Sequence, residues 1–87
     1  MPQIGGDTEQ LAALQATFTR EQAQVESLIS AINGSLGNTW WIGPQADQFR
    51  EEWSGQFMPN LNNLAQALQQ CAQNVQQHMQ GFQQVGG

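Results

Sequence analysis

Apolar residues recur at helical spacing along the first part of the chain and predict an amphipathic helix over about residues 8–36. Glu21 lies where this stripe would take another apolar residue, so it is either a register-setting polar residue or a solvated edge position. The main stripe consists of Leu11, Leu14, Phe18, Val25, Leu28 and Ile32, with Ile29 and Leu36 beside it.

Start and stop signals place the ends of this helix. Asp7 or Thr8 suits the N-cap, because a short polar side chain there accepts a hydrogen bond from a free backbone N–H group. Gly34 and Gly37 are typical of a helix end. The sequence therefore predicts a turn over residues 37–43.

A second apolar stripe predicts a helix over about residues 44–83. Pro44 suits the first helical position, where its missing N–H group costs nothing. Pro59 lies inside the stripe and predicts a bend, because it removes one backbone hydrogen bond. Aromatic residues spaced by four lead into a seam with a period of about 3.5 residues. The residues are Phe49 and Trp53, followed by Phe57, Leu61, Leu64, Leu68, Cys71, Val75, His78 and Phe82.

The two stripes predict an all-α fold, in which residues 1–87 form one domain built as an antiparallel two-helix hairpin. One hairpin buries one seam, and a bundle helix normally carries a wider apolar face. Covering several hundred Å² of such surface is worth several kcal/mol at ~25 cal/mol per Å². We therefore predict a dimer that forms a four-helix bundle. The residues expected to stay exposed in a monomer are Ile29, Leu36, Phe49, Trp53 and Met79.

Composition argues against several classes of function. The chain has two Lys or Arg against seven acidic residues, which argues against nucleic acid because phosphate contacts need clustered cations. A single Cys forms no internal disulfide, and one Cys with one His predicts no metal site and no cofactor. The same scarcity of bases and nucleophiles predicts that the protein is not an enzyme. Its polar surface is instead made largely of Gln.

The sequence also bears on membranes and on secretion. The longest apolar run, 40–42, is far shorter than the roughly 20 residues of a membrane span, although surface contact with a membrane stays open. The first residues lack the basic and apolar regions of a Sec signal peptide. A secreted form would therefore leave the cytoplasm by another route.

A few residues of the turn and of the second helix are candidates for contacts. Gly43 permits a tight turn over which Trp41 packs, and two adjacent Trp residues cannot both face inward easily. We expect one of them to be exposed, and Trp40 is then a candidate contact. Cys71 is expected to pack in the core, with an intermolecular disulfide as the alternative. His78 is expected to be partly buried.

A helical chain of this length with a Trp-x-Gly motif in a mid-chain turn resembles the WXG, or ESAT-6-like, proteins of type VII secretion. The resemblance covers nearly the entire chain, and the position of the motif between two long amphipathic helices makes it fairly specific. The matching residues are the motif Trp41-Ile42-Gly43, Leu36 before it, and Ala46, Phe49 and Trp53 after it.

The resemblance implies a hairpin that pairs with itself or with a paralogous WXG protein and is exported folded by the type VII secretion ATPase. In that family the motif Trp forms a composite export signal with a C-terminal Tyr-x-x-x-Asp/Glu. Here His78 stands in place of the aromatic residue and Phe82 in place of the acid, so either a partner carries the other half or the tail lies beyond the end of this chain. The recognition candidates are Trp40, Trp41, Gly43 and His78.

Three other functions remain open at this point. The first alternative is an adaptor or chaperone that stays in the cytoplasm with a larger toxin-like effector. The second is a membrane-active WXG protein of the pore type. A generic structural coiled coil without an export role is the last alternative. Amide-rich helix flanks carry no charge pattern that would separate self-pairing from pairing with a paralogue.

Overall fold

The structure is a computed structural model that describes residues 5–85, with side-chain surroundings described up to Gly81. Within that range the regular structure is entirely helical, which confirms the all-α prediction. Its elements are α1 (Thr8–Asn38), α2 (Pro44–Glu52), the π-helical turn η1 (Trp53–Phe57) and α3 (Met58–Val85). The predicted side chain of Phe82 lies outside the described residues.

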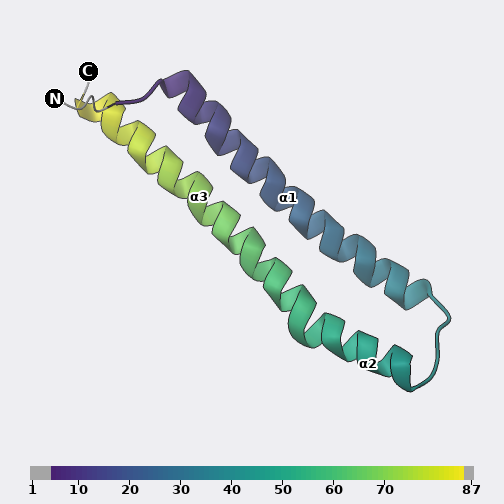
Figure 1. Ribbon diagram of the computed structural model, residues 1–87. Coiled ribbons are helices and arrows are strands. Elements are labelled where there is room, and N and C mark those ends of the chain that lie inside the picture. Colours follow the sequence, from purple (N-terminus) through teal and green to yellow (C-terminus); the bar gives the residue numbers. More distant parts are fainter. Residues whose placement is uncertain (1–4, 86–87) are drawn as a thin grey trace.

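The helices form an antiparallel hairpin (Figure 1). α1 runs alongside α3 for most of its length, and α2 continues the second arm to the connecting segment, residues 39–43. The molecule measures 64 × 21 × 17 Å, so it is an elongated rod about three times as long as it is wide. Figure 1 shows the second arm changing direction where α2 passes through η1 into α3.

Local chemistry explains both ends of α1. Asp7 is the N-cap, and its Oδ1 accepts hydrogen bonds from the N–H groups of Glu9 at 2.9 Å and Gln10 at 3.0 Å. The helix does not stop at Gly34 or Gly37 as the sequence suggested, because neither adopts the positive φ that ends a helix. It continues to Asn38, so the connection starts two residues later than predicted.

The second arm begins at a glycine that the turn requires. Gly43 has a φ of 129°, a region that side-chain-bearing residues rarely adopt, and its carbonyl accepts a hydrogen bond from Asp47 N–H at 3.0 Å. Pro44 follows at the first helical position. The expected bend takes the form of η1, just before Pro59. Since proline offers no N–H group to the carbonyl four residues back, a wider π turn relieves the mismatch there.

The seam between the helices differs from the predicted one by one residue at every second position. Leu14, Leu28, Phe57 and Leu64 were expected in it and are exposed, as is His78. The seam of α1 consists of Leu11, Gln15, Phe18, Gln22, Val25, Ile29, Ile32 and Leu36. The seam of α3 consists of Leu61, Ala65, Leu68, Ala72, Val75 and Met79.

Two features explain this shift. Ala65 and Ala72 are small, so placing them between the helices lets the backbones approach closely, and both are buried. In addition, the seam residues Trp53 and Leu61 are eight residues apart instead of the seven of a regular heptad. η1 absorbs the extra residue, which turns Phe57 out of the seam.

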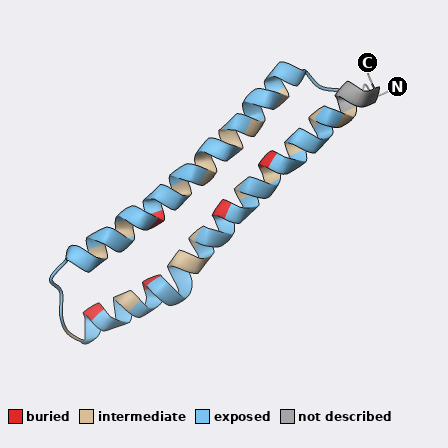
Figure 2. Ribbon diagram, turned by 180° about the vertical axis from the view of Figure 1, so that it is seen from behind, coloured by how far each residue is buried: buried red, intermediate tan, exposed pale blue. Residues whose placement is uncertain are grey.

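The resulting core is thin. Figure 2 shows that the buried positions form an interrupted row on the inward sides of the two arms. Trp53 and Ile29 belong to it, so the prediction that they stay exposed in a monomer is wrong. The buried hydrophobic residues of the described chain are Ile29, Ala46, Trp53, Ala65 and Ala72.

Candidate interaction surfaces

The connecting segment is held against α2 by one arginine. The Arg50 guanidinium donates hydrogen bonds to the carbonyl oxygens of Trp41 at 2.8 Å and Thr39 at 3.3 Å. It also lies 6.0 Å from the centre of the Trp41 ring, and that ring packs on Phe49 with centroids 5.8 Å apart. These contacts hold the connecting segment and the Trp41 ring against α2.

This arrangement separates the roles of the two tryptophans. Trp41 rests on Phe49 and is 40% exposed, whereas Trp40 is 87% exposed and Ile42 is 75% exposed. Two large apolar side chains therefore project from a fixed backbone at the end of the rod. Such anchors lose little conformational freedom on binding, which suits them to a contact surface.

A second polar contact ties the two arms together near this end. Trp53 is 8% exposed, and its indole Nε1–H donates a hydrogen bond of 2.7 Å to Asn33 Oδ1 on α1. The amide nitrogen of Asn33 lies 3.6 Å from the sulfur of Met58. We call the end of the hairpin from Asn33 to Met58 the tip, and the remaining parts of α1 and α3 the shaft.

The exposed large apolar side chains of the shaft share one broad side of the hairpin. The exposed leucines Leu14, Leu28 and Leu64 each follow one seam residue by three positions and directly precede the next: Leu14 precedes Gln15, and Leu64 precedes Ala65. Rotation by 180° about an axis normal to the hairpin plane exchanges the two antiparallel helices and keeps each broad side of the hairpin where it was. Residues with the same offset from the seam in the two helices therefore lie on the same broad side. We call this side the apolar face; it contains Leu14, Leu28 and Leu64.

The other broad side of the shaft has the opposite character. It is formed by exposed polar residues that each come directly after a seam residue in the sequence. We call it the polar face; it contains Thr19, Glu26, Asn62, Gln69 and Gln76. The shaft is therefore one-sided, since its large exposed apolar side chains, Leu14, Leu28 and Leu64, lie on one face.

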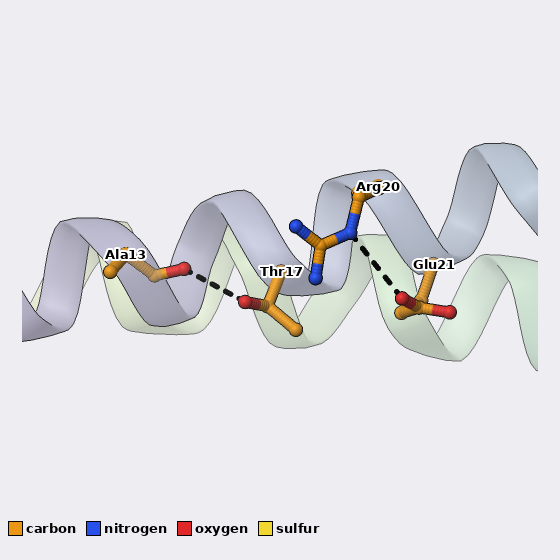
Figure 3. A network of polar contacts seen from close by, with 4 residues as sticks. All are labelled: Ala13, Thr17, Arg20 and Glu21. Carbon is orange, nitrogen blue, oxygen red and sulfur yellow. Dashed lines mark hydrogen bonds and ion pairs between the residues drawn. The ribbon is translucent and has the colours of Figure 1, made fainter.

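Glu21 and its surroundings interrupt the apolar face on α1. Glu21 lies seven residues from both Leu14 and Leu28, and its side chain is 46% exposed. Arg20 Nε contacts its Oε1 at 3.4 Å, while the Arg20 side chain is 63% exposed. Figure 3 shows this pair beside the Thr17 hydroxyl, which donates to the Ala13 carbonyl at 3.0 Å. Glu21 thus has the solvated edge position that the sequence left open.

Two further sequence candidates lie along the same face of α3. Cys71 is half-buried and His78 is exposed, whereas His78 was expected to be partly buried. Both occupy the offset of Leu64, seven and fourteen residues further on. Cys71 and His78 therefore lie outside the seam between the helices, whereas the sequence placed both of them on it.

Sequence reasoning missed the side chains that organise the tip. Arg50 was not singled out, because its partners are carbonyls nine and eleven residues away. Asn33 was missed as well, since its bond to Trp53 spans the two arms. The one signal in the sequence was that Arg50 is one of the chain's two cationic residues.

The described residues also bear on other chemistry. Residues 5–85 contain no group of three or more His, Cys, Asp or Glu side chains arranged to hold a metal ion. No described helix combines the length and apolar character that crossing a membrane requires. Comparison with known proteins found no matching family model, curated protein or solved structure. The interpretation of function therefore rests on the tip and the apolar face.

Proposed function

We propose that this protein is a non-enzymatic, WXG-type subunit of a type VII secretion system that acts by helix–helix binding. In this proposal it pairs through its apolar face with itself or with a paralogous hairpin, and the pair is a four-helix bundle. The complex is made in the cytoplasm and exported by the secretion ATPase. The supporting observation is the fixed Trp41-Ile42-Gly43 turn with Trp40 and Ile42 projecting from it.

The two surfaces divide the work in this proposal. The tip supplies rigid aromatic contacts for the secretion machinery. The apolar face supplies the contact with the paired subunit, because a thin core alone gives a small domain little stability. A partner with a C-terminal Tyr-x-x-x-Asp/Glu completes the export signal that the resemblance implies.

Export from a host that carries a type VII secretion ATPase tests the proposal. The chain and its co-expressed paired subunit are expected in the culture filtrate of the normal strain and not in that of an ATPase-deficient strain. Trp40→Ala is expected to lower the ratio of filtrate to lysate roughly tenfold, because it removes a projecting contact. The matched control is Gln66→Ala, an exposed change on α3 away from both surfaces.

Thermal unfolding of the Trp40→Ala variant checks that the effect is one of recognition. Trp40 is 87% exposed, so the midpoint is expected to stay within a few degrees of that of the original chain. Equal export with and without the ATPase refutes the proposal. Retention of the chain in the cell while a larger effector is exported supports the adaptor function instead.

A further inference from the structure

Arg50 holds the middle of the connecting segment, whose two ends are bound to the helices. At one end Thr39 donates to carbonyls of α1, from its hydroxyl at 2.6 Å and from its N–H group at 3.4 Å. At the other end the Gly43 carbonyl accepts from the first turn of α2 at 3.0 Å. Between these ends, the hydrogen bond that the structure describes to the backbone is the one from Arg50 to the Trp41 carbonyl, at 2.8 Å. The arrangement of the middle of the segment therefore depends on this side chain.

The guanidinium binds the segment at two points with two different nitrogens. Nη1 donates to the Trp41 carbonyl and Nη2 to the Thr39 carbonyl. Because the guanidinium is planar and its donors are fixed, both bonds form together only when the two carbonyls keep one relative orientation. A lysine ammonium has all its donors on one nitrogen and does not reproduce this pair of bonds.

The two bonded carbonyls belong to the peptide units that precede the projecting side chains. A peptide unit is planar, so binding its carbonyl oxygen also orients its N–H group and the Cα atom that follows. The Thr39 carbonyl shares a peptide unit with the N–H of Trp40, and the Trp41 carbonyl shares one with the N–H of Ile42. Trp40 and Ile42 are 87% and 75% exposed, so their direction depends on the backbone more than on side-chain packing.

These bonds determine the arrangement of the segment more than the stability of the fold. Both bonds are exposed, so without Arg50 the two carbonyls would bind water instead. The bond between Trp53 and Asn33 would still join the arms. The segment would then adopt other arrangements as well, and binding at the tip would fall with the fraction of molecules that present both side chains.

We infer that Arg50 is the positioning residue of the tip. Its guanidinium orients two peptide units so that Trp40 and Ile42 project together, and lysine does not replace it. The inference rests on the proposed function for what the tip contacts. It adds to the recognition surface a residue outside the Trp-x-Gly motif, which acts through the projecting side chains.

Nuclear magnetic resonance relaxation of the backbone N–H groups tests the positioning directly in the full chain. In the original chain we expect order parameters of roughly 0.85 for the N–H groups of Trp40 and Ile42, and in Arg50→Lys values below about 0.6. Arg50→Gln is expected to behave in the same way, because an amide offers donors on one nitrogen only. In each variant an unchanged indole resonance of Trp53 shows that the arms remain joined.

Arg20→Lys is the matched control, because it makes the same substitution at the chain's other arginine. Arg20 lies in the shaft and its side chain is 63% exposed. Both order parameters are expected to keep the values of the original chain in this variant.

Export then tests whether the positioning matters for recognition. In the host that carries the secretion ATPase, Arg50→Lys is expected to lower the ratio of filtrate to lysate roughly threefold, and Arg20→Lys to leave it unchanged. In the Trp40→Ala background the same Arg50→Lys change is expected to cause a smaller loss, because one of the side chains that it positions is gone.

Each result decides for or against the inference. Order parameters that stay high in Arg50→Lys overturn it and leave the proposed function standing. Lowered order parameters with unchanged export overturn it too, since the segment then need not be held for recognition. An equal loss with and without Trp40→Ala shows that Arg50 contacts the machinery itself. Export of the original chain without the ATPase refutes the proposed function, whereas the order parameters still decide whether Arg50 orients the segment.

Discussion

The tip and the shaft of the hairpin are held together by different kinds of interaction. At the tip, Trp53 is buried and bonded to Asn33, and Arg50 binds two carbonyls of the connecting segment. In the shaft, the described side-chain hydrogen bonds stay within one helix, such as those of Thr17 and Gln22. The arms of the shaft are joined by apolar contact, in which the buried Ala65 and Ala72 alternate along α3 with the larger, half-buried Leu61, Leu68 and Val75.

This difference shows which part of the molecule is held in one defined arrangement by directional contacts. Directional bonds and a large aromatic side chain specify one arrangement at the tip. Small seam residues allow close approach but bury little apolar area per residue, so the shaft gains less from its contacts. A partner on the apolar face would add apolar contact along the shaft, where the described residues of the two arms lack side-chain hydrogen bonds between them.

Trp53→Ala tests the tip with the largest expected effect. Loss of the buried indole and of its bond to Asn33 is expected to lower the free energy of unfolding by about 3 to 5 kcal/mol. That is comparable to the whole stability of so small a domain, so urea unfolding followed by far-UV circular dichroism should lose its cooperative transition.

Trp40→Ala is the matched control for that change. It removes an indole that is 87% exposed, and its effect on the free energy of unfolding is expected to stay within about 0.5 kcal/mol. Comparable losses for the two variants would show that the tip is not organised around Trp53.

Gly43→Ala is expected to have the next largest effect. A φ of 129° is strained for any residue with a Cβ, so the substitution should cost about 1 to 3 kcal/mol although the space around it is open. Gly34→Ala is the control, because Gly34 is helical and equally open. It should stabilise the chain by about 0.5 to 1 kcal/mol in the same urea titration. Equal effects of the two changes would contradict the requirement for Gly43.

Much of this fold follows from local sequence. Asp7 caps α1 as expected, and Pro44 begins the second arm, because both act on backbone groups within a few residues. The all-α architecture follows from apolar periodicity in the same way. These features depend on the chain's immediate neighbours, so a single sequence is enough to predict them.

The side of each helix that faces the seam was harder to predict. Both neighbouring columns of α3 are apolar, one with Leu64 and the other with Ala65, and periodicity alone favoured the larger residue. Close approach of the helices favours the alanine, which is a tertiary effect. The candidate surfaces follow the same division: the motif was visible in the sequence, whereas the Arg50 contacts and the shared apolar face depend on the fold.

The smallest expected effect comes from a substitution in the seam of the shaft. Gln15 is half-buried in the seam between Leu11 and Phe18, where an amide contributes less apolar contact than a leucine would. Gln15→Leu is therefore expected to raise the free energy of unfolding by about 1 kcal/mol in urea titration. Hydrogen exchange should slow mainly in the shaft, because the added contact lies there.

Gln66→Leu distinguishes this effect from a general gain in hydrophobicity. Gln66 is exposed on α3, away from the seam, so the same substitution is expected to change the free energy of unfolding by less than about 0.5 kcal/mol. If both variants are stabilised equally, the seam assigned to α1 is wrong. The other outcome is that Gln15→Leu alone is stabilising and slows hydrogen exchange only in the shaft. In that case the composition of the seam limits the stability of the shaft. The tip then folds around Trp53 largely independently of it.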